Sequence, residues 1–128
     1  VKDGNLLQLL GTEWGRNTLG ENIWVDCLKT KVHDSIAKLF IVGDCRFENE
    51  LTAFDNDREV RVIKVRLECP EVVRKSRCSM WRENTGHPSE VSLDRASRAD
   101  EFDLYFYTEN DPVEECARKV LEKVYASA

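Results

Sequence analysis

The chain has 128 residues, with 19 Lys or Arg against 24 Asp or Glu and a formal net charge of -5. With 41% hydrophobic and 34% charged residues, this length predicts a single globular domain over residues 1–128. The acidic balance argues against a protein that coats nucleic acid, because that task needs a basic face. The longest apolar run, residues 39–42, is too short to span a bilayer, so we expect no membrane partner.

The five cysteines also limit the class of protein. Their number is odd and none of them form a C-x-x-C pair, which fits neither a disulfide framework nor a zinc or redox motif. No secretory signal is visible from Val1 onward. We therefore expect reduced thiols and a cytoplasmic location.

In chain order, the first predicted elements are helical. Residues 7–16 contain small residues together with Trp14 and Arg16. Apolar side chains recur every three to five residues along 23–36, which predicts a helix there. Residues 39–42 follow as a continuous β-prone run and predict a strand.

The second half of the chain is predicted to contain two more strands and two helices. The strands are residues 60–65 and Leu104–Tyr107, and a short helix is expected over 71–79. The last helix covers 113–124, with Asp111 as its N-cap and Pro112 as its first residue. Helices that alternate with apolar strands indicate an α/β fold, a mostly parallel sheet with flanking helices.

Asp44 is the first candidate for chemistry, because it follows the predicted strand of residues 39–42. Ligands of α/β proteins bind beyond the carboxyl ends of strands, so this carboxylate could hold Mg²⁺ or a substrate. Arg46 could offer bidentate donors to a phosphate. One alternative is that Asp44 caps a helix beginning near Arg46. The other is that Arg46 forms an ion pair with a neighbouring carboxylate (Asp44, Glu48 or Glu50).

A second candidate combines Arg16 with two tryptophans, Trp14 and Trp24. These residues suit a pocket that holds a planar base against an aromatic face and pairs Arg16 with an anion. The alternative is a helix that ends at Gly11 or Gly15 and simply buries its tryptophan.

The third candidate is a basic stretch, residues 66–82, which has five basic and two acidic side chains. Such a segment could close over phosphates as a lid, or it could be a solvated face. His87 has no Cys or His at ligand spacing, so a hinge or loop role is favoured over zinc binding. No motif supports nucleophilic catalysis.

Together these segments resemble the deoxynucleoside monophosphate kinases of bacteriophages and related viruses, a branch of the P-loop kinases. The family's Asp-Val-Arg-Phe motif is Asp-Cys-Arg-Phe here, with Cys45 in place of Val. The matching stretches are residues 7–16, 20–25, 44–50, 62–66 and 87–90, and Phe102-Asp103.

The resemblance implies a role for each candidate. It implies a helical region for nucleoside monophosphate binding at residues 5–36 and a lid-like segment at 66–90. Arg16 and Arg46 would hold the acceptor phosphate, Trp14 or Trp24 would line the base pocket, and Asp44 would serve Mg²⁺ and catalysis. The lid arginines would approach the transferring group (Arg74, Arg77 and Arg82).

The sequence departs from the family at one point, because it contains no Gly-x-x-x-x-Gly-Lys-Ser/Thr loop. The fold is therefore expected to be P-loop-kinase-like but without the first strand and the phosphate loop. The expected function is transfer of the ATP γ-phosphoryl group to a deoxynucleoside monophosphate in a longer chain that supplies the loop, with ATP and Mg²⁺ as cofactors. Alternatives are a non-catalytic nucleotide-binding or interaction protein and a phosphomevalonate-kinase-like enzyme. A homodimer is also possible, through an uncovered sheet edge.

Overall fold

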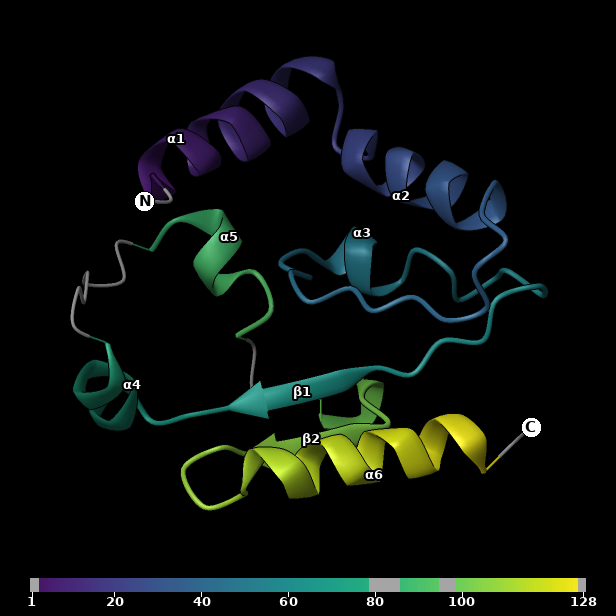
Figure 1. Cartoon of the computed structure of the whole chain (residues 1–128). Helices are drawn as coiled ribbons and strands as arrows, with labels where there is room; N and C mark the ends of the chain where they lie inside the picture. The colour runs from purple at the N-terminus through teal and green to yellow at the C-terminus, as the bar shows by residue number, and fades with distance from the viewer. Residues whose placement is uncertain (1–2, 79–85, 95–98, 127–128) are drawn as a thin grey trace. The chain divides into compact units, whose positions relative to one another are not determined.

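The computed structural model describes residues 3–78, 86–94 and 99–126 of the chain. These residues form a mixture of helices and one two-stranded parallel sheet (Figure 1). They fall into two compact units, one made of residues up to Val60 together with Gly86–Asp94, and the other of the remaining described residues. The single domain expected from the chain length stays a prediction. Arg82, expected in the lid, lies outside the described residues.

The first unit begins with a long helical segment. Asp3 starts α1 (Gly4–Gln8), because its side chain accepts hydrogen bonds from the backbone N–H groups of Asn5 and Leu6. The π-helix η1 (Leu9–Leu19) continues from α1 without a break (Figure 1). Helix η1 ends at Gly20, which has a positive φ of 130° that residues with a side chain rarely adopt.

Three more helices complete the first unit. They are α2 (Ile23–His33), α3 (Glu48–Leu51) and α5 (Pro88–Val91). Helix α2 confirms the periodicity seen in the sequence but ends at His33, so the predicted helix over 23–36 is too long by three residues. Val25 of α2 is the buried apolar side chain of this unit among the described residues.

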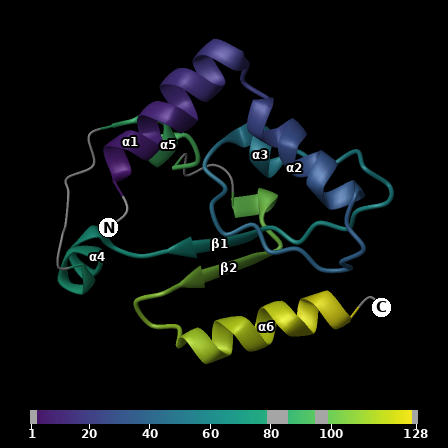
Figure 2. The ribbon, with the colours of Figure 1, turned by 45° about the horizontal axis from the view of Figure 1, so that its top comes forward.

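The second unit contains the sheet, formed by β1 (Val65–Glu68) and β2 (Leu104–Tyr107). The strands pair in parallel, with Val65 opposite Leu104, and α6 (Val113–Tyr125) runs beside them (Figure 2). Phe106 of β2 is buried here. The short α4 (Glu71–Arg77) follows β1, and a single 3₁₀ turn, η2 (Ala99–Glu101), precedes β2.

Two of the strand predictions need correction. Residues 39–42 form no strand, because no described segment pairs with them, and their apolar side chains are left exposed, Ile41 by 89%. The strand expected at 60–65 begins only at Val65, since its partner β2 begins opposite that residue. Leu104–Tyr107 is confirmed as a strand.

The start of α6 also differs from the expectation. Pro112 occupies the N-cap position, and the Asp111 carboxylate instead accepts a hydrogen bond from the backbone N–H of Tyr107. The helix itself is confirmed, and Arg118 pairs with Glu115 and Glu122 on its surface. No helix in the described part of the chain has the length and apolar character needed to cross a bilayer.

Candidate functional site

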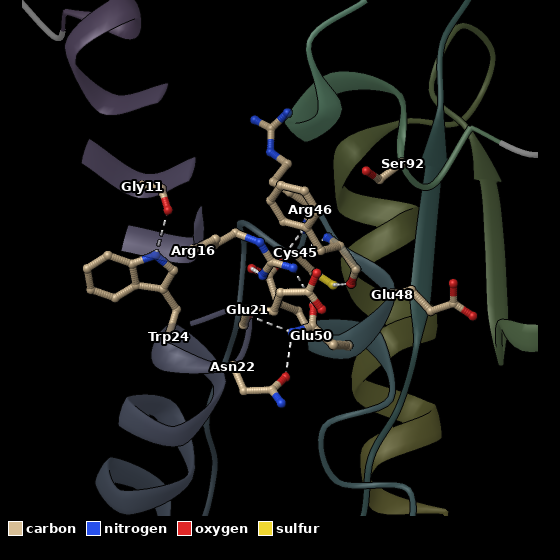
Figure 3. Close-up of polar contacts among 12 residues, drawn as sticks. Gly11, Arg16, Glu21, Asn22, Trp24, Cys45, Arg46, Glu48, Glu50 and Ser92 are labelled. Carbon is tan, nitrogen blue, oxygen red and sulfur yellow. Dashed lines mark hydrogen bonds and ion pairs between the residues drawn. The ribbon is translucent and has the colours of Figure 1, made fainter. Parts of the chain in front are cut away.

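Arg16, on η1, is held by side chains of one short segment, residues 47–50. Its Nη2 donates a hydrogen bond of 3.0 Å to Asn49 Oδ1. Its guanidinium carbon lies 3.8 Å from the centre of the Phe47 ring, and its Nη1 lies 3.6 Å from Glu50 Oε1. The side chain is only 10% exposed, so the guanidinium is both buried and fixed in orientation (Figure 3).

One nitrogen of this guanidinium is buried and makes no hydrogen bond within the described structure. Arg16 Nη1 is buried and has no hydrogen-bond partner among the described residues, because its 3.6 Å distance to Glu50 is too long for one. Buried donors are nearly always satisfied, and an exception calls for an acceptor. Arg16 therefore has a buried donor that lies in an ion pair with Glu50 but makes no hydrogen bond among the described residues.

Glu50 organises the turn that leads into α3. Its Oε2 accepts hydrogen bonds from the backbone N–H groups of Arg46, at 2.7 Å, and Phe47, at 3.0 Å. These bonds satisfy donors at the start of the helix. The alternative that Asp44 caps a helix beginning near Arg46 is therefore wrong, since α3 begins at Glu48 and Glu50 takes the capping role.

Asn49 connects the same turn to the beginning of α2. Its side-chain amide donates to the backbone oxygen of Glu21, at 2.9 Å, and to Asn22 Oδ1, at 2.8 Å (Figure 3). Because Asn49 also accepts from Arg16, this one side chain joins η1, the turn before α2, and α3. The position of Arg16 thus depends on three elements.

Arg46 has a more open environment than Arg16. Its Nε donates a 2.8 Å hydrogen bond to Asp44 Oδ1, and its Nη1 lies 3.4 Å from Glu90 Oε2. The hydrogen bond to Asp44 is the main cause that raises the pKa of Arg46. The side chain is 47% exposed and extends away from Glu50 (Figure 3). The ion pair considered from the sequence is formed, with Asp44, and the side chain remains accessible to a phosphate.

Asp44 itself is mostly exposed, and its described partner is the Arg46 guanidinium. Among the described residues, no group of three or more acidic, His or Cys side chains could enclose a metal ion. Mg²⁺ is often bound through a single carboxylate together with water and substrate phosphates. Asp44 fits a site of that kind, and its role at Mg²⁺ stays a prediction.

His87 attaches the Gly86–Asp94 segment to η1. Its Nδ1 accepts from the backbone N–H of Ser89, at 3.2 Å, so the proton belongs on Nε2, which lies 2.9 Å from Glu13 Oε1. This hydrogen bond from His87 is the main cause that lowers the pKa of Glu13. The segment is therefore held at two points, by His87 on Glu13 and by Glu90 on Arg46.

Trp24 packs against a glycine rather than enclosing an empty pocket. A Cβ atom added to Gly15 would lie 2.6 Å from Trp24 Cζ2, and Trp24 Nε1 donates a 2.8 Å hydrogen bond to the Gly11 oxygen. The alternative in which the helix ends at Gly11 or Gly15 is wrong, because η1 continues to Leu19. Trp14 and Trp24 are both partly exposed, and their contact with a base stays a prediction.

No protein-family model, curated protein or solved structure matches this chain.

Two of the arginines expected in the lid, Arg74 and Arg77, lie in the second unit. Arg74 and Arg77 belong to α4, and Arg77 donates to the Thr108 oxygen at 3.0 Å and contacts Cys69 Sγ at 3.8 Å. The expected lid-like segment, 66–90, is not one element, because its first residues are in β1 and its last in the first unit. A lid role for these arginines stays a prediction.

The contacts of Asn49 and Glu50 with Arg16 were not predicted from the sequence. Both lie 33 or more positions after Arg16, so helical or strand periodicity could not connect them to it. The sequence signal that could have identified these residues is the run of polar side chains after Phe47.

Proposed function

We propose that the first unit binds the acceptor nucleotide of a deoxynucleoside monophosphate kinase-like protein. The observation that carries this proposal is the Nη1 donor of Arg16, which makes no hydrogen bond among the described residues, on a guanidinium that is nine-tenths buried. A phosphate oxygen is the acceptor that such a planar, always charged group binds best. Arg46, whose backbone N–H is held by Glu50, would supply a second guanidinium from an exposed side chain.

The reaction would be transfer of the ATP γ-phosphoryl group to the acceptor phosphate, giving ADP and a deoxynucleoside diphosphate. Arg16 and Arg46 would orient the acceptor and reduce its charge, which are the main contributions a protein makes to phosphoryl transfer. Bound Mg²⁺ neutralises charge on the donor phosphates, and Asp44 would hold it. Arg74, Arg77 and Arg82 remain the proposed lid residues.

The donor site needs a phosphate loop that this sequence does not contain. We propose that a longer chain supplies it within a strand-loop-helix unit. Residues 39–42 support this finer fold, because they are apolar and exposed and pair with no strand within the described structure. Strand β1 likewise pairs only with β2 in the described sheet, and so has a second edge for another strand.

A second candidate is a non-catalytic nucleotide-binding protein of the same fold, favoured by the absence of the loop from the sequence. The partly exposed tryptophans favour a nucleotide over the isoprenoid substrate of a phosphomevalonate-kinase-like enzyme. A cytoplasmic location is supported by the five free cysteines. Homodimer formation remains part of the proposal.

Titration calorimetry of the 128-residue chain tests binding, using each deoxynucleoside monophosphate and its nucleoside. Arg46→Ala should weaken monophosphate binding by roughly 10- to 150-fold and leave nucleoside binding unchanged. Arg58→Ala, an exposed arginine of the same unit, is the control. Equal losses for both ligands would mean that Arg46 acts structurally.

A coupled ADP-release assay separates the two candidate functions. The 128-residue chain alone should bind the nucleotide without turnover, whereas a chain extended through a Gly-x-x-x-x-Gly-Lys-Ser/Thr loop should phosphorylate it. Binding without turnover by the extended chain would favour the non-catalytic protein. Robust turnover by the short chain would contradict the proposed donor site.

A further inference from the structure

Glu50 contacts both arginines of the proposed phosphate site with different atoms. Its Oε2 holds the backbone N–H of Arg46 at 2.7 Å, while its Oε1 lies 3.6 Å from Arg16 Nη1 (Figure 3). The Glu50 side chain is 19% exposed, so neighbouring residues restrict its conformation. One carboxylate therefore connects the two residues whose spacing would decide how a phosphate is held.

The presence of a carboxylate beside an anion site needs an explanation. Two unit charges of the same sign repel at short range, so Glu50 as a simple neighbour would weaken phosphate binding. Burying the Arg16–Glu50 pair also costs desolvation energy, and such pairs are often no more stable than apolar replacements. If Glu50 orients the two arginines, this would explain why a carboxylate lies beside the proposed phosphate site.

The orientation of Arg16 is fixed by three contacts, none of which is a hydrogen bond to Nη1. Asn49 accepts from Nη2, the Phe47 ring lies under the guanidinium plane, and Glu50 lies beside Nη1 without bonding it. Bidentate recognition of a phosphate requires that plane to be set in advance. Of the three, Glu50 also fixes the backbone of Arg46.

We propose that Glu50 is a positioning residue that sets Arg16 and Arg46 in register for one phosphate group. This inference rests on the proposed function, since it names the residue that prepares the same site. Glu50 does not touch the ligand; it acts through the two arginines.

Glu50→Gln is the decisive substitution. The glutamine oxygen can still accept from the backbone of Arg46 and Phe47, so α3 can still form, but an N–H₂ group then faces Arg16 in place of an acceptor. We expect monophosphate affinity to fall by about 10-fold, with nucleoside affinity unchanged. If Glu50 only repelled the ligand, the same substitution would tighten monophosphate binding. The opposite signs distinguish the two explanations.

Glu48→Gln is the matched control, because it removes the same charge from the same helix. Its side chain is exposed and points away from Arg16 (Figure 3). We expect its monophosphate affinity to remain within about two-fold of wild type. A loss equal to that of Glu50→Gln would overturn the positioning role.

A nucleotide-free measurement keeps this inference separate from the proposed function. The ¹H–¹⁵N NMR signals of the Arg16 guanidinium should be sharp in the wild-type chain and averaged by rotation in Glu50→Gln, with Glu48→Gln resembling wild type. If the wild type binds no monophosphate, the proposed function fails and these signals alone decide the positioning role. Unchanged Arg16 signals in Glu50→Gln would overturn it, even where circular dichroism shows both variants folded.

Discussion

Arg16 and Arg46 are two arginines of the same unit in opposite environments. Arg16 is 10% exposed and packs against an aromatic ring and an amide, whereas Arg46 is 47% exposed and is paired with two surface carboxylates. The contacts of Arg16 are dictated by packing, while those of Arg46 can be exchanged for a ligand. The comparison indicates that the Arg16 guanidinium has a fixed orientation, whereas the Arg46 guanidinium can change its contacts.

The largest expected difference between the two is in stability. Arg16→Ala should lower the free energy of unfolding by about 3 kcal/mol, because it removes the ion pair with Glu50, the hydrogen bond to Asn49 and the packing on Phe47. Arg46→Ala should cost less than about 1 kcal/mol, as expected for exposed ion pairs. Urea unfolding of both variants measures this, and equal losses would remove the distinction.

The packing around Arg16 can be tested at its neighbour, Gly15. Gly15→Ala should destabilise the chain by about 1–3 kcal/mol, since the new Cβ atom would collide with the Trp24 ring. Gly11→Ala is the matched control, because nothing lies within 4 Å of a Cβ atom there and alanine favours a helix by about 0.5–1 kcal/mol. Thermal unfolding should therefore show opposite signs, and a harmless Gly15→Ala would mean that this packing is loose.

Because the ion pairs of Arg46 are exposed, we expect that removing one of them will raise the affinity for a monophosphate. Glu90→Gln removes a carboxylate that competes with a phosphate for Arg46 Nη1, so monophosphate binding should tighten by about two- to five-fold. Asp94→Asn, on the same Gly86–Asp94 segment, controls for the change in net charge. Calorimetry should show no gain with the nucleoside. Weaker monophosphate binding would show that Glu90 supports the site instead of competing with its ligand.

The smallest expected effect is the pH dependence of the contact between Glu13 and His87. The pKa of Glu13 is lowered from its ordinary value of 4.5 by the hydrogen bond from His87, so the folded chain binds fewer protons here than the unfolded chain. The contribution to stability is present above pH 4.5 and is lost as the pH falls below that value through the lower folded pKa. The difference in Tm between wild type and Glu13→Gln should shrink from pH 6 to pH 3. A constant difference would mean that the contact adds nothing.

The outcome for two short apolar runs shows which parts of the fold are predictable from sequence. Leu104–Tyr107 forms a strand as predicted, because β1 lies opposite it, whereas residues 39–42 have the same apolar character and no described partner. Local pattern predicts the tendency to extend, but strand formation depends on a neighbour that the pattern does not name. The helices α2 and α6 were predictable because their apolar periodicity is local.

Some residues of the candidate site could likewise be predicted from the sequence, and others could not. Arg16 and Arg46 were identifiable from residue type and from the resemblance of their motifs, and their ability to bind a phosphate stays a prediction. Asn49 and Glu50 became visible only once the chain brought residues 47–50 against η1. The contact of Trp24 with Gly15 was likewise missed, since a glycine was interpreted as a helix end rather than as space for a ring.

The exposed run at residues 39–42 has a consequence for handling the protein. An exposed apolar segment that pairs with no strand is a template on which copies of a chain can stack into fibrils. Lys38 and Asp44 stand on either side of the run as opposite charges, the gatekeeper arrangement by which proteins discourage such self-assembly. Asp44 would then protect solubility as well as serve Mg²⁺, and neutralising it would promote aggregation at high protein concentration.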